Sequence, residues 1–306
     1  MEIVRTLAPN PLAHPAVLTM GKFDGLHLGH QRLITTTIEH AAALGLTSAV
    51  LTWDPHPYAV LRANEPLRLL TPLAEKIELI AQYNPDRLII APFTPATMAS
   101  SARNYMAQVA AAQPLRELWV GEGFAMGRER TGDIASLMLI GMELGFAVGT
   151  VSKIVLDGQP VSSSRVRALL ARGAVSDVTP LLGRPFSLRG IVVQGDQRGR
   201  TLGFPTANLA IPSEHLLPAD GVYACHVCLN ATNIPAVTNI GIRPTFDGLK
   251  RTIETHLLDW SGDLYGQTLS VAFIAPLRGE QKFSSLQALI AQIGQDVAQA
   301  RRMLGA

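Results

Sequence analysis

The segment 21–30, which reads GKFDGLHLGH, combines glycines with two histidines just before a helical pattern. Glycine lets a backbone turn tightly and approach a ligand, and the first turn of a helix offers free N–H groups and partial positive charge to a phosphate. His27 and His30 are three residues apart, so they share one face of a helical turn. Two imidazoles beside a phosphate seat could donate hydrogen bonds to phosphate oxygens and stabilise a pentacoordinate phosphorus.

Other roles stay open for these two histidines. Either could be an ordinary core or surface group, and histidines at this spacing could also ligate zinc. The sequence shows no third zinc ligand to accompany them.

A second segment, 161–167, reads VSSSRVR and also precedes a helical pattern. Serines at a helix start are ordinarily N-caps. Arg167, one turn into the helix, could instead bind the phosphates of a leaving group. The segment is weak evidence alone, but together with the histidine segment it favours a phosphate site.

A third segment, 195–208, reads GDQRGRTLGFPTAN and lacks the spacing of a Walker A motif. Its glycines leave N–H groups open to phosphates, and the oxygens of Thr206 and Asn208 could hold Mg²⁺. If 205–209 is extended, these two side chains point to the same face. The alternative is a polar turn whose Thr and Asn bond to their own backbone.

Glu254 lies inside an alternating strand pattern over 252–258. An acid at a strand centre is costly unless it faces water or a site. It is therefore either a solvent-facing residue or a general base that takes a proton from a substrate hydroxyl.

The elements that must position these residues differ between the two halves. The first half alternates strands and helices, which predicts a parallel sheet with helices on both faces and ligands outside the carboxyl ends of the strands. The predicted strands are 17–20, 48–53, 87–91, 117–120 and 146–151. The predicted helices are 29–44, 72–83, 103–112, 134–144, 164–171 and 175–182.

The second half contains closely spaced strands separated by Gly, Pro, Asn and Asp, which predicts a small antiparallel barrel. The predicted strands are 187–194, 223–229, 236–240, 252–258 and 269–274, followed by a terminal helix whose apolar face packs on the barrel. The segment 183–185, Gly-Arg-Pro, breaks the chain between the halves. We therefore predict domains at 1–183 and 184–306, in an α/β plus all-β architecture.

Composition bounds the remaining function classes. The chain has 306 residues, 47% apolar and 16% charged, so it is long enough for two domains and is not disordered as a whole. Its formal net charge of +2, without a basic run, gives no support to a nucleic-acid partner. No stretch approaches the roughly 20 apolar residues of a membrane helix, and the first residues lack the pattern of a secretory signal. We therefore expect a cytoplasmic protein without a membrane partner; an oligomer remains open.

The two cysteines form a C-x-x-C pair, Cys225 and Cys228, which could serve a redox or metal site. The surrounding sequence reads as a strand, where residues three apart point to opposite faces. No second pair completes a four-ligand zinc site, so we expect two ordinary strand residues.

The chain resembles a known family over essentially its whole length. The segments GKFDGLHLGH, TWDPHP at 52–57, VGEGFAMG at 120–127 and SSSRVR at 162–167 resemble the nucleotidyltransferase module of bacterial bifunctional riboflavin kinase/FAD synthetases. Seven further segments resemble the riboflavin kinase module of the same family. They are LGRP at 182–185, GDQRGR at 195–200, GFPTAN at 203–208, GVY at 221–223, NIGIRPTF at 239–246, LYG at 264–266 and LRGEQKF at 277–283.

The resemblance implies riboflavin phosphorylation to FMN, and FMN adenylylation to FAD with release of pyrophosphate, with ATP as co-substrate and Mg²⁺ as cofactor. Its catalytic residues would be His27, His30 and Glu254. Its nucleotide contacts would be Gly21, Phe23, Asp24, Gly29, Ser163, Ser164, Arg167, Gly199, Gly203 and Pro205. Thr206 and Asn208 would bind the metal, and Asn239 and Arg243 the flavin.

Four positions depart from the family pattern. Gly123 stands where Asp or Asn is usual, Met126 where an aromatic residue is usual, Ser164 where Thr is commoner and Trp53 where Phe is commoner. Gly123 removes a polar group whose hydrogen bond to a charged substrate would be worth roughly 1.5–3 kcal/mol. Two alternatives therefore accompany the bifunctional enzyme: a riboflavin kinase with an impaired adenylyltransferase module, and a flavin- or nucleotide-sensing protein that binds without turnover.

Overall fold

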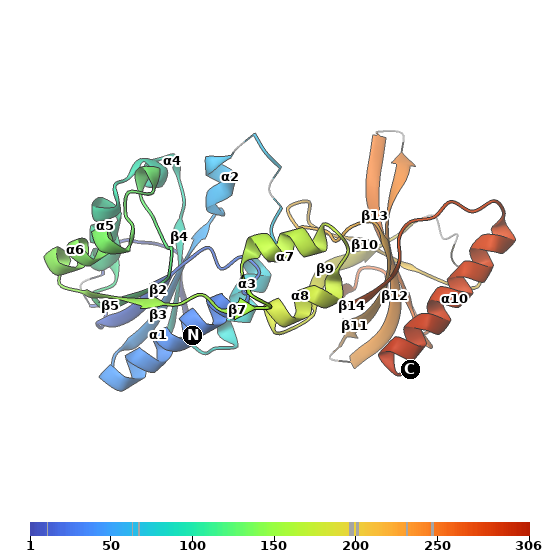
Figure 1. Cartoon of the computed structure of the whole chain (residues 1–306), viewed down its shortest axis with the longest axis horizontal. Coiled ribbons are helices and arrows are strands. Elements are labelled where there is room, and N and C mark those ends of the chain that lie inside the picture. Colours follow the sequence, from blue (N-terminus) through green and yellow to red (C-terminus); the bar gives the residue numbers. More distant parts are fainter. Residues whose placement is uncertain are drawn as a thin grey trace. The chain divides into compact units, whose positions relative to one another are not determined.

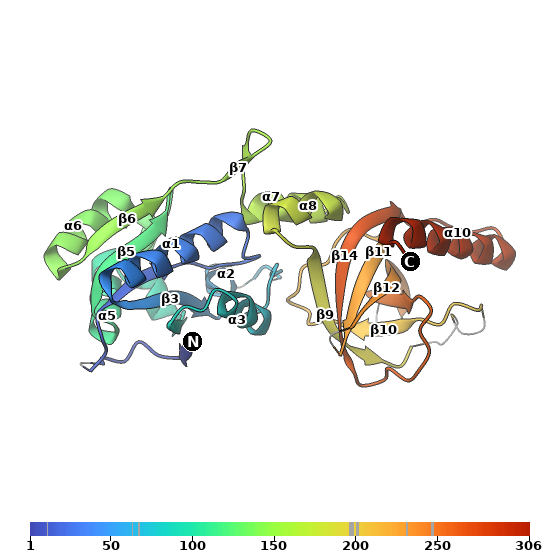
Figure 2. The ribbon, with the colours of Figure 1, turned by 90° about the horizontal axis from the view of Figure 1, so that it is seen from below.

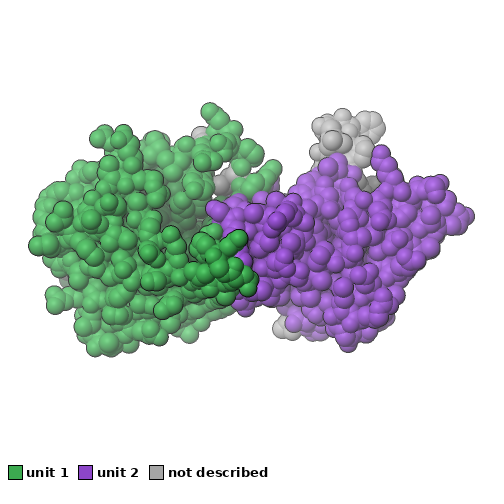
Figure 3. All heavy atoms as spheres, viewed as in Figure 1, with its two compact units in different colours: residues 1–163 green, residues 164–306 purple. Residues whose placement is uncertain are grey.

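The computed structural model describes residues 1–10, 12–62, 64–66, 68–195, 199, 202–230, 232–245 and 248–306, and of 243–245 and 248–250 only the backbone. The chain divides into two compact units, residues 1–163 and 164–306 (Figure 3). Among the described residues, no helix combines the length and the apolar character needed to cross a membrane.

The first unit is built on a six-stranded parallel sheet in the order β1-β4-β3-β2-β5-β6 (Figure 1). The strands are β1 (Glu2–Val4), β2 (Ala16–Met20), β3 (Thr47–Asp54), β4 (Arg87–Pro92), β5 (Leu115–Gly121) and β6 (Ala147–Val151). The central strands β2 and β3 are almost wholly buried along their length. This is the pattern of strands that are covered on both faces.

Two apolar clusters cover the two faces of this sheet, as the sequence predicts. One cluster receives Leu33 and Ile34 from α1 (Leu28–Leu44) and Ile80 from α3 (Leu73–Ala81). The other receives Met106 from α5 (Ala102–Ala112) and Leu137 from α6 (Ile134–Leu144). Two short helices, α2 (Pro57–Leu61) and α4 (Pro95–Ala99), follow β3 and β4 and were not predicted.

The strand order creates a switch point at β2. From β2 the chain continues to β3 and β4 on one side of the sheet, then returns to place β5 and β6 on the other. Ligands of open α/β sheets bind outside the carboxyl ends of the strands at such a point. The histidine segment 21–30 leaves β2 at this end and enters α1.

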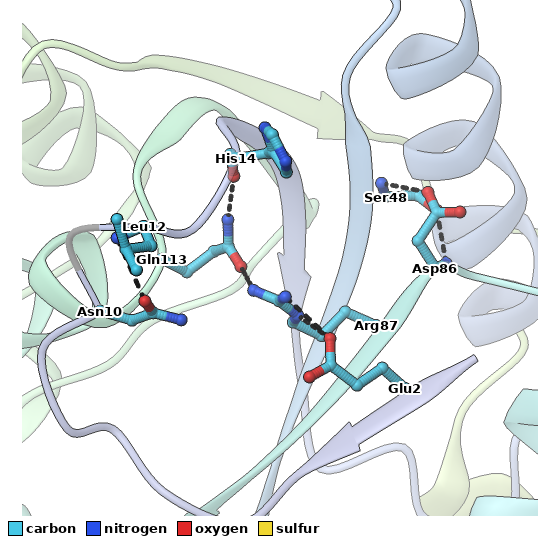
Figure 4. Close-up of polar contacts among 8 residues, drawn as sticks. All are labelled: Glu2, Asn10, Leu12, His14, Ser48, Asp86, Arg87 and Gln113. Carbon is cyan, nitrogen blue, oxygen red and sulfur yellow. Dashed lines mark hydrogen bonds and ion pairs between the residues drawn. The ribbon is translucent and has the colours of Figure 1, made fainter.

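The opposite end of the sheet is fixed by polar contacts (Figure 4). Arg87, at the start of β4, donates from Nε to Glu2 Oε2 at 2.9 Å and from Nη1 to Gln113 Oε1 at 2.5 Å. The buried Gln113 in turn donates to the carbonyl of His14 at 2.6 Å. These contacts hold β1 beside β4, an edge strand that the sequence analysis missed.

The second unit contains a closed antiparallel barrel in the order β10-β13-β12-β11-β14-β9. The strands are β9 (Phe186–Val193), β10 (Ala207–Ala210), β11 (Gly221–Leu229), β12 (Thr232–Thr245), β13 (Gly248–Leu257) and β14 (Thr268–Arg278). Figure 2 shows α10 (Leu286–Leu304) along the outside of the barrel, where its Ala300 and Val297 pack in a cluster with Val222 of β11. The predicted α/β plus all-β architecture is confirmed.

The two compact units meet after residue 163, earlier in the chain than the predicted domain boundary after residue 183. Helices α7 (Ser163–Leu170) and α8 (Val175–Leu182) are counted almost entirely with the second unit. A short hairpin, β7 (Val155–Leu156) and β8 (Gln159–Pro160), precedes them. The boundary at 183 stays a prediction.

The two cysteines behave as the strand pattern predicts. In β11, Cys225 is buried and Cys228 is exposed, and both thiols are free. Burial raises the pKa of the Cys225 thiol to about 12, so it stays protonated and unreactive. In the described part of the chain, no group of three or more His, Cys, Asp or Glu side chains is placed to hold a metal ion.

Candidate active sites

The two histidine rings of the first unit are stacked against each other at the amino end of α1. His27 is the N-cap residue, and its ring lies 3.7 Å from that of His30, centroid to centroid, at an interplanar angle of 19°. Phe23 meets the His30 ring edge-on at 5.3 Å. Both imidazoles therefore project from the helix start at the carboxyl end of β2.

Burial decides the protonation state of this pair. It lowers the pKa of His27 to about 4. Burial also lowers the pKa of His30 well below its usual value, with help from the nearby charges of His27 and Lys76. The Nδ1 atoms of both rings are covered and lack a hydrogen-bond partner among the described residues. At neutral pH the site therefore presents two neutral imidazoles, whose pKa values an incoming polyphosphate would raise.

The glycines of the histidine segment make room for its own side chains. A Cβ at Gly21 would lie 3.0 Å from the Phe23 ring, and one at Gly29 would lie 3.2 Å from the His27 ring. Phe23 is fully buried, although its φ of 48° is unusual for a side chain of this size. Phe23 therefore packs beneath His30 and supports the imidazole from inside the fold.

Asp24 anchors the histidine segment to two distant parts of the chain. Its buried carboxylate accepts hydrogen bonds from the backbone N–H groups of Leu70 at 2.9 Å and Thr71 at 3.1 Å. Its carbonyl accepts from Ser163 Oγ at 2.8 Å. The predicted pair of segments, 21–30 and the serine segment, thus meets through Ser163, at 139 residues' separation.

Ser164 and Arg167 lie in α7 and are counted with the second unit. Their predicted part in a phosphate site stays a prediction.

Two lysines of the first unit were missed by the sequence analysis. Lys76 of α3 is 3% exposed; burial lowers its pKa, and the carboxylates of Asp24 and Asp54 act in the opposite direction. Lys22 places its Nζ 4.0 Å from the ring centroid of Tyr58. Lys22 lies inside the histidine segment but was not singled out, and Lys76 belongs to no motif, because what identifies both lysines is their neighbours in space.

Gly123 occupies a turn that follows β5. The N–H of Phe124 donates to the carbonyl of Gly121 at 2.9 Å, and Gly123 has a φ of +84°. Glycine, asparagine and aspartate are the residues that tolerate this conformation. A Cβ at this position would contact only the end of Lys153, at 3.7 Å, so the space for a larger side chain exists.

The site of the second unit is assembled by strand register. Glu254 of β13 is paired with Asn208 of β10 on one side and with Asn239 of β12 on the other. All three are half-buried, whereas their neighbours Ala207, Ile240 and Ile253 are buried in the barrel. The three polar side chains therefore form one row across the outer face of the barrel.

Thr206 and Asn208 alternate with the buried Ala207 and Leu209, so both project outward on the same face of the chain. The backbone at 205 is fixed by a 2.7 Å hydrogen bond between the Pro205 carbonyl and His256 Nδ1. The predicted metal pair thus lies at the edge of the row that contains Glu254.

Two described glycines before β10, Gly195 and Gly199, lie close to these two side chains. A Cβ at Gly195 would collide with the Asn208 amide, and one at Gly199 would collide with the Phe204 carbonyl and lie 3.1 Å from Thr206 Oγ1. Gly203 turns the chain with a φ of +85°. At Gly195 and Gly199 the backbone therefore approaches Asn208 and Thr206 more closely than a residue with a side chain would allow.

The predicted flavin contacts are described only in part. Asn239 belongs to the row on the barrel, but the side chain of Arg243 lies outside the described residues, as do 196–198, 200, 201 and 246 of the motifs. Glu280, which follows β14, was not singled out by the sequence, and its carboxylate lies where a Cβ at Gly241 would stand.

Comparison with known proteins finds one family model in each half of the chain. The family model for FAD synthetase matches residues 10–165, and the model for riboflavin kinase matches residues 182–304. A bifunctional riboflavin kinase/FMN adenylyltransferase from Escherichia coli strain K12 is 37% identical over 291 residues, covering 94% of this chain and 93% of that protein. One from Bacillus subtilis strain 168 is 35% identical, covering 94% and 92%.

A solved structure described as a macrolide-efflux protein from Streptococcus pneumoniae has the same fold. Its TM-score is 0.88 at 27% sequence identity, and the match covers 98% of both chains. With both family models matched in order and with full-length relatives above 30% identity, this chain belongs to the family of bifunctional riboflavin kinase/FMN adenylyltransferases.

Proposed function

We propose that this chain phosphorylates riboflavin to FMN on its barrel and adenylylates FMN to FAD on its parallel-sheet unit, with ATP as co-substrate of both reactions. The observation that carries the proposal is the row formed by Asn208, Glu254 and Asn239, which places a carboxylate between two amides on an open barrel face. A protein that only binds flavin has no use for a base at this place.

In the kinase step, the oxygen of the ribityl 5′-hydroxyl attacks the γ-phosphorus of ATP, and Glu254 takes the proton of that hydroxyl. The bond from that phosphorus to the bridging oxygen breaks, and ADP leaves. Catalysis of this kind depends mostly on positioning and charge. Glu254 is half-buried and within 3.5 Å of Thr252 Oγ1, so its carboxylate is oriented but remains accessible.

The residues near the glycine loop suit Mg²⁺. Thr206 and Asn208 offer oxygen ligands, which this ion prefers, and Gly195 and Gly199 carry no Cβ that would collide with the Asn208 amide or crowd Thr206 Oγ1. The ion would supply charge neutralisation for the phosphates of ATP. The proposal therefore includes Mg²⁺ at Thr206 and Asn208, with nucleotide contacts at Gly199, Gly203 and Pro205 and flavin contacts at Asn239 and Arg243.

In the adenylyltransferase step, a phosphate oxygen of FMN attacks the α-phosphorus of ATP, and pyrophosphate leaves as the α–β bridging bond breaks. No protein nucleophile is required. His27 and His30 are neutral before the substrate binds, and they donate hydrogen bonds to the phosphate oxygens as charge develops there. Asp24, Ser163 and Phe23 hold the histidine segment in place.

We further propose that the protein works in the cytoplasm, which is supported by its two free thiols in place of a disulfide.

The test is a product time course with purified protein, riboflavin, ATP and Mg²⁺, separating riboflavin, FMN and FAD. We expect FMN to rise and then to convert to FAD. Accumulation of FMN without FAD would support the kinase and contradict the proposed second activity. Binding of flavin without either product would favour a sensing protein and overturn the proposal.

A further inference from the structure

Two cations lie over one exposed aromatic ring at the carboxyl end of the parallel sheet, and the charge of a third acts on its hydroxyl. Lys22 Nζ lies 4.0 Å from the centroid of the Tyr58 ring, and the guanidinium carbon of Arg62 lies 5.4 Å from it. The charge of Arg130 also reaches the Tyr58 hydroxyl, whose pKa is lowered mainly by its hydrogen bond to Lys22. Tyr58 is 42% exposed, so this cluster is open to solvent.

These residues lie in segments that follow three neighbouring strands. Lys22 follows β2, Tyr58 lies in α2 after β3, and Arg130 lies in the short 3₁₀ helix η1 (Arg128–Arg130) after β5. The order β3-β2-β5 makes these strands adjacent. The cluster therefore lies at the switch point, at the same end of the sheet as the stacked histidines.

The backbone of Lys22, inside the histidine segment, is held by its neighbours. The N–H of Gly21 donates to the Leu51 carbonyl at 3.0 Å, and Thr52 Oγ1 donates to the Lys22 carbonyl at 3.4 Å. The next residue, Phe23, packs against His30. These contacts fix the backbone at Lys22, and its ammonium group lies over the Tyr58 ring.

The charges of the cluster are incompletely balanced. Arg62 pairs with Glu65 at 3.2 Å, and Glu129 lies between Arg128 and Arg130 in the chain. Within the described ranges, no carboxylate lies within ion-pair distance of Lys22. A cation–π contact at an exposed site is worth only about 0.5–1 kcal/mol, so an incoming phosphate would compete well for the ammonium group.

We propose that Lys22 binds a phosphate of the anionic substrate at this site, and that Tyr58 is a positioning residue that holds the Lys22 ammonium at the edge of the site until the substrate arrives. The proposal rests on the proposed adenylyltransferase function of the histidine segment. The phosphate belongs either to FMN or to the polyphosphate of ATP, because both present the same chemistry to a lysine.

The first test is titration of the full chain with inorganic pyrophosphate by calorimetry. Lys22→Gln is compared with Arg116→Gln, which removes one positive charge from an exposed position near the start of β5, away from the site. We expect Lys22→Gln to raise the Kd about tenfold, as loss of one phosphate contact worth about 1.4 kcal/mol would do. Arg116→Gln should leave the Kd within about twofold of the unsubstituted protein, and Lys22→Arg should restore most of the affinity. Equal Kd values for Lys22→Gln and the unsubstituted chain would overturn the proposal.

The second test separates the two sources of the phosphate and the role of the tyrosine. With FMN and ATP supplied, a higher KM for FMN alone in Lys22→Gln identifies the FMN phosphate, and a higher KM for ATP alone identifies the polyphosphate; no change in either KM contradicts the proposal. Tyr58→Leu should raise the same KM about threefold at nearly unchanged kcat, because it removes both the ring and the hydroxyl that Lys22 contacts. Tyr58→Phe should have a smaller effect, because it keeps the ring and loses only the hydroxyl. An unchanged or lower KM in Tyr58→Leu would overturn the positioning role.

These outcomes are distinguishable from failure of the proposed function. If the unsubstituted chain forms no FAD, the adenylyltransferase proposal fails, while the pyrophosphate titration still decides whether Lys22 binds phosphate.

Discussion

Glu254 of β13 and Asn208 of β10 are direct partners in the barrel ladder, although 46 residues separate them in the chain. Asn239 of β12 flanks Glu254 on the other side. Side chains of directly opposed residues in neighbouring strands have Cβ atoms about 4.5–5.5 Å apart. A carboxylate and two amide groups are thus brought together by register alone.

The first prediction concerns Glu254 as the proposed base. Glu254→Gln keeps the size of the side chain but removes its ability to accept a proton. We expect FMN formation from riboflavin to fall by about 10²- to 10⁴-fold, while FAD formation from supplied FMN persists. Product analysis by chromatography measures both reactions. Glu214→Gln, at an exposed position of the same unit, is the matched control, and unchanged kinase turnover in Glu254→Gln would remove Glu254 from its proposed role.

The second prediction concerns the stacked histidines. His30→Ala removes a ring that lies 3.7 Å from His27 and is supported by Phe23. We expect FAD formation from supplied FMN to fall by about 10²- to 10³-fold, the usual effect of losing one donor to a developing negative charge. Riboflavin phosphorylation should be unaffected. His14→Ala, an exposed histidine at the other end of the sheet, is the control; loss of phosphorylation alone in His30→Ala would reverse the assignment of the two units.

The third prediction is a pH dependence of stability. Folding lowers the pKa of His27 from 6.5 to about 4. Between these two pH values the His27 side chain is protonated in the unfolded chain and neutral in the folded unit. Stability from this group is complete above pH 6.5 and is lost as the pH falls toward 4. Between pH 7 and pH 5 we expect a loss of about 2 kcal/mol from His27. Urea unfolding of the full chain and of His27→Gln at both pH values measures it; the same loss in the variant would contradict the assignment.

The fourth prediction addresses the departure at position 123. Gly123 has a φ of +84°, and only the tip of Lys153 lies near its missing Cβ. Asparagine tolerates this backbone and offers a polar group, so Gly123→Asn should raise kcat/KM for FAD formation about tenfold if it regains a hydrogen bond to the substrate. Gly123→Ala is the control, because it carries the backbone strain without the amide. Equal effects of the two substitutions would show that position 123 contacts no substrate group.

The sequence determined the local elements because their signals are local. The apolar run ending at Met20 and the glycine after it place β2 and the turn, and the helical pattern after His27 places α1. Strand alternation correctly put Cys225 and Cys228 on opposite sides and Thr206 and Asn208 on the same side. Periods of 2 and 3.6 residues can be read from neighbouring residues alone.

Only the tertiary structure decided which distant residues meet. The motif predicts Asp24 as a nucleotide contact, and only the fold shows that its carboxylate accepts hydrogen bonds from the backbone of Leu70 and Thr71. The pairing of Glu254 with Asn208 and the contact of Lys22 with Tyr58 depend on sheet register and strand order. Such contacts leave no periodic trace in the sequence, because they are fixed by packing and hydrogen bonding between segments far apart in the chain.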